Sequence, residues 1–169
     1  MREIIDHYTD NETAIEVASF VGAAAAVLLV FFGAYLRSVL SAAEGPGGML
    51  SALTLVGTAV IAVGLAIDIT ISIALAEAVE DIEPAAVQAL QALWDNDFVP
   101  LALGALVFLI STGLSIVRHG ALPKWLGWIA LVLAVVGFTP IGFVAFIGAG
   151  LWIAVVSVML ALQARRATS

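Results

Sequence analysis

Long apolar runs separated by short polar stretches dominate the pattern of hydrophobic and polar positions along this chain. The first run, 17–36, contains no charged residue and is followed by Arg37. A second run, 50–76, is interrupted only by Asp68, and a third, 98–117, follows an acidic loop. About 20 apolar residues are enough for a helix to cross the ~30 Å hydrocarbon core of a bilayer. Each of these three runs therefore predicts a transmembrane helix.

The last apolar stretch, from Trp125 to Gln163, is too long for a single crossing. As one helix it would be about 58 Å long, nearly twice the thickness of the hydrocarbon core. The segment 137–142 reads Gly-Phe-Thr-Pro-Ile-Gly, and glycine and proline in this arrangement are typical of a tight turn. We therefore expect two helices here, 122–138 and 143–163. The sequence as a whole predicts an all-α membrane bundle of five transmembrane helices within a single domain, 1–169.

The positive charges predict how this bundle is oriented. With five spans, all but one of the Lys and Arg residues fall on the same side: Arg37, Arg118, Lys124, Arg165 and Arg166. The exception is Arg2. Because loops rich in Lys and Arg remain in the cytoplasm, we expect the N-terminus outside and the C-terminus inside. The corresponding location is the cell membrane, with several crossings.

The acidic loop between the second and third spans contains a further predicted helix, 84–94. Pro84 can begin a helix, and apolar residues then recur at helical spacing: Val87, Leu90, Leu93 and Trp94. One interpretation is an amphipathic helix that lies on the outer membrane surface. The other is a helix packed across the end of the bundle.

Composition excludes several classes of protein. Apolar residues make up 63% of the chain and charged residues only 11%, whereas a soluble domain has about 25% charged residues. The net charge of −7 argues against nucleic-acid binding, which needs a basic surface. There is no Cys, and neither His7 nor His119 lies within an apolar run, so a haem held by two intramembrane histidines is excluded. We expect no cofactor and no metal site.

The acidic N-terminal segment lacks the basic start of a signal peptide, so we expect the first span to be retained.

Asp68 is the only ionisable residue inside an apolar run, and it is the main candidate site residue. A charge at the bilayer centre costs about 2.5–3.5 kcal/mol on insertion scales, so Asp68 is expected to face protein or water. One face of the second span carries a stripe of small and polar residues: Thr54, Gly57, Ile61, Gly64, Asp68 and Ser72. Small residues allow a neighbouring helix to approach closely. Asp68, Ser72 and Thr54 are therefore candidates for a ligand-binding or proton-responsive site.

The alternative is that Asp68 has a structural role. It can hydrogen-bond a neighbouring helix, or it can lie at the outer membrane interface if the second span is shifted. The sequence provides no second acid, base or Arg within an apolar run to complete a proton relay. The hydroxyl-bearing residues of the spans are expected to bond to the preceding turn or to a neighbouring helix. His7 and Tyr8 are expected to lie in a solvated N-terminal tail.

The segment 118–128 reads Arg-His-Gly-Ala-Leu-Pro-Lys-Trp-Leu-Gly-Trp. It resembles a segment found in a family of small multi-span membrane proteins of actinobacteria and other prokaryotes. In that family a helix ends in this basic turn and a further helix follows. The resemblance implies a multi-helix membrane architecture. The family has no established activity, so no site residues follow from the resemblance.

No catalytic motif is present, and we expect a protein that is not an enzyme. The favoured interpretation is an accessory or scaffold subunit that acts through helix–helix contacts. Its expected partners are the lipid bilayer and, in addition, further copies of itself or another membrane protein. The alternative is a small transporter or sensor of a proton, a cation or an apolar ligand that uses Asp68.

Overall fold

The computed structural model describes residues 2–78, 82–139 and 142–167, and these residues form helices and turns without any strand. The helices are α1 (Arg2–Glu44), α2 (Met49–Ala78), α3 (Pro84–Trp94), α4 (Phe98–His119), α5 (Lys124–Gly137) and α6 (Phe143–Ala167). The all-α prediction is therefore confirmed. Among the described residues, four segments are long and apolar enough to cross a membrane: Thr13–Glu44, Met49–Glu77, Pro84–His119 and Phe143–Gln163. Because α5 is shorter, a fifth crossing stays a prediction.

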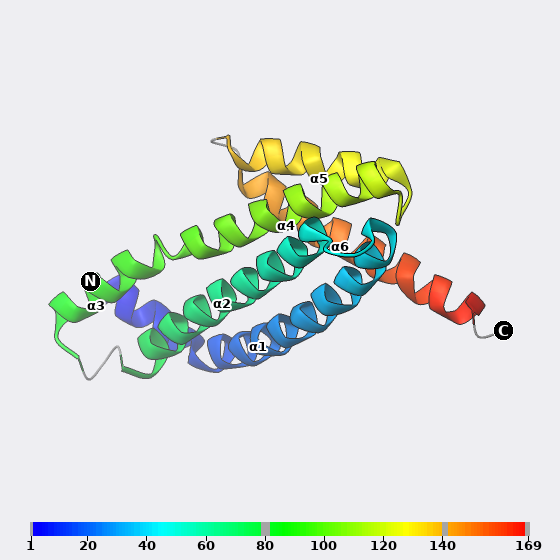
Figure 1. Ribbon diagram of the computed structural model, residues 1–169. Coiled ribbons are helices and arrows are strands. Elements are labelled where there is room, and N and C mark those ends of the chain that lie inside the picture. The colour runs from blue at the N-terminus through cyan, green and yellow to red at the C-terminus, as the bar shows by residue number, and fades with distance from the viewer. Residues whose placement is uncertain (1, 79–81, 140–141, 168–169) are drawn as a thin grey trace.

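The helices α1, α2 and α4 lie side by side, with α2 in the middle, and α5 packs against α4 (Figure 1). The helix α1 starts at one end of the bundle, and α6 runs toward the opposite end (Figure 1). The α1–α2 turn and the α4–α5 turn both lie at the end toward which α6 runs. Arg118 and Lys124, which flank the α4–α5 turn, are therefore at the same end of the bundle as the α1–α2 turn.

The contact between α2 and α4 is close because glycines lie at the helix crossing. A Cβ atom at Gly57 would lie 2.6 Å from the backbone nitrogen of Phe108, and one at Gly104 would lie 2.6 Å from that of Ile61. No larger residue fits at such distances without moving a backbone. The small-residue stripe of the second span therefore faces α4, as small residues in membrane helices are expected to do.

Aromatic side chains join three helices in the core of the bundle. Phe108 on α4 is fully buried, and its ring lies 6.5 Å from that of Phe32 on α1 and 5.7 Å from that of Trp152 on α6. The Trp152 indole nitrogen donates a hydrogen bond of 2.9 Å to the carbonyl of Leu126 on α5. This bond satisfies a polar group that would otherwise be buried in an apolar environment.

The helix α1 is much longer than the apolar run 17–36, because the acidic N-terminal segment continues the helix from Arg2. The expectation of a solvated tail is wrong at Tyr8, which is buried against Ile71, Leu75 and Val87. The predicted helix 84–94 is α3, and its Val87 is fully buried in this cluster. Of the two arrangements predicted for this helix, the contacts agree with packing across the end of the bundle.

The C-terminal apolar stretch divides into two helices where the glycine- and proline-containing turn was predicted. The helix α5 ends at Gly137 and α6 begins at Phe143. With 14 residues, α5 is about 21 Å long, which is less than the thickness of the hydrocarbon core. At the start of α5, Pro123 precedes the first helical residue, and at the end of α4, Gly120 has the positive φ angle of 75° that ends the helix.

Candidate functional site

Asp68 lies on α2 near the end of the bundle where α3 packs. Its side chain is half-buried and lines a cavity of about 240 Å³ between α1 and α2. Ser19 of α1 and Ser72 of α2 line the same cavity. Asp68 and Ser72, two of the three predicted site residues, are therefore brought together at a hollow in the structure.

A second carboxyl group lies beside Asp68. Asp97 directly precedes α4, and its carboxyl group is within hydrogen-bonding reach of that of Asp68. The Oδ2 atom of Asp97 is buried, and no donor among the described residues forms a hydrogen bond to it. The sequence offered no second acid within an apolar run, because Asp97 lies in the turn before the third span. The apolar runs alone therefore gave no sign that Asp97 lies next to Asp68.

The register between α2 and α4 explains this pairing. Thr54 faces Ser111, and further along the helices the close contacts join Gly57 to Phe108 and Gly64 to Leu101. Each step forward on α2 is matched by an equal step backward on α4. One helical turn beyond Gly64, the same register brings Asp68 opposite Asp97.

Side-chain hydrogen bonds link α1 and α2 to α3 at the end of the bundle where the acid pair lies. The Trp94 indole nitrogen donates to the Ser72 hydroxyl at 3.1 Å. The Tyr8 hydroxyl donates to Gln91 Oε1 at 3.1 Å, and Gln91 Nε2 donates to Asp95 Oδ1 at the same distance. Burial raises the pKa of the Tyr8 phenol, and the nearby charges of Asp95 and Asp68 raise it further. Tyr8 therefore remains a neutral hydrogen-bond donor.

Thr54, the third predicted site residue, lies far from Asp68. It is fourteen residues earlier on α2, which corresponds to about 21 Å along the helix axis. Its hydroxyl is buried and lies 3.2 Å from Ser111 Oγ and 3.0 Å from Thr112 Oγ1. It also donates to the carbonyl of Leu50, as expected for a hydroxyl in a membrane helix. Thr54 therefore shares a helix face with Asp68 but belongs to a separate hydroxyl cluster.

Glu44 is a polar residue whose contacts the sequence interpretation missed. It ends α1, and its carboxyl group accepts a hydrogen bond of 2.5 Å from the Ser115 hydroxyl of α4. The backbone nitrogen of Ser51, in the first turn of α2, donates to it at 3.1 Å. A Cβ at position 48 would lie 2.3 Å from Glu44 Oε2, so Gly48 leaves room for the carboxyl group. The available signal was an acid followed by Gly45-Pro46-Gly47-Gly48 directly before a helix start.

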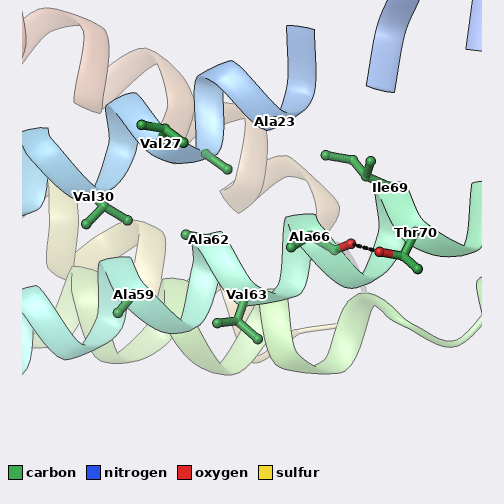
Figure 2. A pocket seen from close by; sticks show the side chains of 10 residues that line it. Ala23, Val27, Val30, Ala59, Ala62, Val63, Ala66, Ile69 and Thr70 are labelled. Atoms are coloured by element: carbon green, nitrogen blue, oxygen red, sulfur yellow. Dashed lines mark hydrogen bonds between the residues drawn. The ribbon is translucent and has the colours of Figure 1, made fainter. Parts of the chain in front are cut away.

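A second, larger hollow is an open apolar groove of about 560 Å³ on the outer surface of α1 and α2 (Figure 2). We call it the α1–α2 groove. Small and branched apolar side chains line it, together with one hydroxyl: Ala23, Ala26, Val27, Val30, Ala59, Ala62, Val63, Ala66, Ile69 and Thr70. The Thr70 hydroxyl donates back to the carbonyl of Ala66, so it presents no free donor to the groove. Ile69 lines both this groove and the cavity at Asp68.

Within the part of the chain that the structure describes, no group of three or more His, Cys, Asp or Glu residues is placed to hold a metal ion. The acid pair is the principal candidate site, because two carboxyl groups lie together there beside a cavity. No family model matches this chain, and neither does any curated protein or solved structure.

Proposed function

We propose that this chain is a multi-pass integral membrane protein that binds protons or other cations at the acid pair Asp68–Asp97. The observation that carries the proposal is the approach of these two carboxyl groups beside a cavity. Two ionised carboxylates within hydrogen-bonding reach of each other repel, and a shared proton or a bound cation relieves that repulsion. The site therefore favours the bound form over the empty, doubly ionised form.

The polar groups near the acid pair are neutral or acidic, which favours a bound positive charge. Tyr8, which stays neutral, lies close enough to Asp68 and Asp95 for their charges to raise its pKa, and it is linked to Asp95 through the amide of Gln91. Ser72 and Trp94 add only neutral hydrogen-bonding groups. Asp95 increases the negative potential, which attracts cations from solution.

The proposed orientation has the N-terminus outside, so that the acid pair opens toward the outer face of the cell membrane. The observation in favour is that the α1–α2 and α4–α5 turns lie together at the end of the bundle opposite α3. These turns follow Arg37 and contain or adjoin Arg118 and Lys124, and such residues mark the cytoplasmic side. We further propose five crossings and a role without catalysis.

Proton and cation flux into proteoliposomes tests this function directly. Asp68→Asn and Asp97→Asn are each expected to abolish pH-dependent flux, or pH-dependent proton uptake if the protein is a sensor without transport. Glu77→Gln is the matched control, because Glu77 is an exposed carboxylate on the same helix. Unchanged flux and unchanged proton uptake in both Asp variants would contradict the proposal.

An accessory or scaffold role is a second proposal, and the outer surface of α1 supports it. This long helix presents large apolar side chains outward over several turns: Val17, Phe20, Val21, Leu28 and Phe31. Such a face can pack against lipid or against a helix of another subunit. Native mass spectrometry from mild detergent tests the role. A scaffold is expected to retain a partner or further copies of itself, and a strictly monomeric, partner-free preparation would count against it.

A further inference from the structure

The cavity at Asp68 has a mixed lining that favours an organic ligand. Its polar groups are the Asp68 carboxyl and the hydroxyls of Ser19 and Ser72, and the other side chains that line it are apolar. A small inorganic cation prefers to be surrounded by oxygen ligands, which this lining does not supply on every side. An organic ammonium ion needs a counter-charge on one side only and gains from apolar contact on the others.

The α1–α2 groove adjoins this cavity. Ile69 lines both hollows, and on α1 the cavity ends at Gly22 where the groove begins with Ala23. Figure 2 shows Ile69 near the end of the groove, beyond Ala66. The space beside Ile69 exists because the residue facing it is glycine: a Cβ at Gly22 would lie 3.1 Å from Ile69 Cδ1. Ile69 is thus the side chain that divides an acidic hollow from an apolar one.

Together the two hollows match an amphiphile with a positive head. The groove is apolar throughout, and its volume of about 560 Å³ lies within the range of roughly 300–1,000 Å³ found for small-molecule sites. The head end is negative, because Asp68 is adjacent to Asp97. An anionic or uncharged head would lose this complementarity.

We propose that Asp68 binds the head of an organic ammonium ion whose hydrocarbon group lies in the α1–α2 groove. This inference rests on the proposed function, because it names the chemical class of the cation that the acid pair takes. The hydrocarbon group reaches the groove from the lipid side of α1 and α2, past Ile69. The protein then takes up the cationic amphiphile from the membrane, with its charged head at the acid pair.

The test measures binding of labelled dodecyltrimethylammonium to the full-length protein in uncharged maltoside micelles, with empty micelles subtracted. We expect Asp68→Asn to weaken binding about tenfold or more, and Glu77→Gln to leave it unchanged. Tetramethylammonium is expected to bind about tenfold or more weaker than the dodecyl compound, because it lacks the hydrocarbon group. Dodecanol, which lacks the charge, is expected to bind equally to wild-type and Asp68→Asn.

A variant that fills the groove distinguishes binding of the charged head from binding of the hydrocarbon group. Ala66→Phe places a ring in the groove. It is expected to weaken binding of the dodecyl compound about tenfold and to leave binding of tetramethylammonium unchanged. Ala59→Phe does the same at another point on the groove, so a folding defect in one variant does not remove the test. Binding of dodecyltrimethylammonium that is insensitive to Asp68→Asn, or to both Phe variants, would overturn the inference.

The same protein preparations distinguish this inference from the proposed function. If proton uptake depends on Asp68 and Asp97 but ammonium binding does not depend on Asp68, the inference fails and the proposed function stands. If Asp68→Asn changes neither proton uptake nor ammonium binding, both fail.

Discussion

Asp68 of α2 and Asp97 before α4 face each other, although the sequence separates them by a whole loop and a further helix. They meet because α2 and α4 keep one antiparallel register from Thr54–Ser111 through Gly57–Phe108 to the end of α2. Close glycine contacts hold this register, since only glycine permits the observed backbone approach. The chemistry of the candidate site is therefore a consequence of helix packing.

The acid pair predicts that stability depends on pH. Repulsion between two carboxylates is relieved when they share a proton, so the wild-type protein is expected to resist heat better at about pH 5 than at about pH 8. In Asp97→Asn the repulsion is absent. The difference in the free energy of unfolding between the two pH values is then expected to be smaller by about 1 kcal/mol, or roughly 2–4 °C in Tm. Thermal unfolding in detergent at both pH values measures this. An Asp97→Asn protein with the same pH dependence as wild-type would contradict the prediction.

The helix crossing predicts a strong effect of a single methyl group. Gly57→Ala would place its Cβ 2.6 Å from the backbone nitrogen of Phe108, so α2 and α4 must separate, and we expect a loss of about 1–3 kcal/mol. Gly150→Ala is the control, because no atom lies within 4 Å of the Cβ that it would add. Urea or heat unfolding in detergent compares the two variants. Equal stability would show that the close α2–α4 contact is not needed.

Glu44 is expected to stabilise the joint between α1, α2 and α4. Glu44→Ala removes the acceptor of the Ser51 backbone nitrogen and of the Ser115 hydroxyl, and we expect a loss of about 1–2 kcal/mol. A double-mutant cycle with Ser115→Ala measures the coupling between the two side chains, which is expected to be at least about 0.5 kcal/mol. A coupling energy of zero would mean that the Glu44–Ser115 hydrogen bond makes no contribution to stability.

Trp152 provides a test of the aromatic core. Trp152→Phe keeps an aromatic ring beside Phe108 but removes the hydrogen bond to the Leu126 carbonyl, so a loss of about 1 kcal/mol or more is expected. Trp128→Phe is the matched control, because the Trp128 side chain is 59% exposed and lies outside the core. Thermal unfolding of both variants checks the difference, and equal losses would contradict a special role of the Trp152 hydrogen bond.

The proposed orientation predicts that a reporter fused after Ser169 is active only if it functions in the cytoplasm. Positively charged residues near the α1–α2 and α4–α5 turns are expected to hold that end of the bundle inside. A pair of fusions to alkaline phosphatase and to green fluorescent protein measures the location of the C-terminus. Phosphatase activity of the first fusion, without fluorescence of the second, would show that the C-terminus lies outside and would contradict the proposed orientation.

The sequence alone determined the class of the fold and most of the helices. Apolar runs of membrane-spanning length and a turn of glycine and proline are local patterns, and local patterns are enough to predict a helix and its end. The same reasoning identified Asp68 as unusual, because a charge inside an apolar run is costly wherever the neighbouring helices lie. It also predicted that the stripe from Thr54 to Ser72 faces protein.

The tertiary structure decided which residues share a site. A helix face can be read from spacing along the chain, but the register between two helices depends on how side chains and backbones of both fit together. For this reason Thr54 and Asp68 share a face yet lie in separate clusters, whereas Asp97, from a polar turn, joins Asp68. The burial of Tyr8 and the contacts of Glu44 follow from the same cause, because their partners are on other helices.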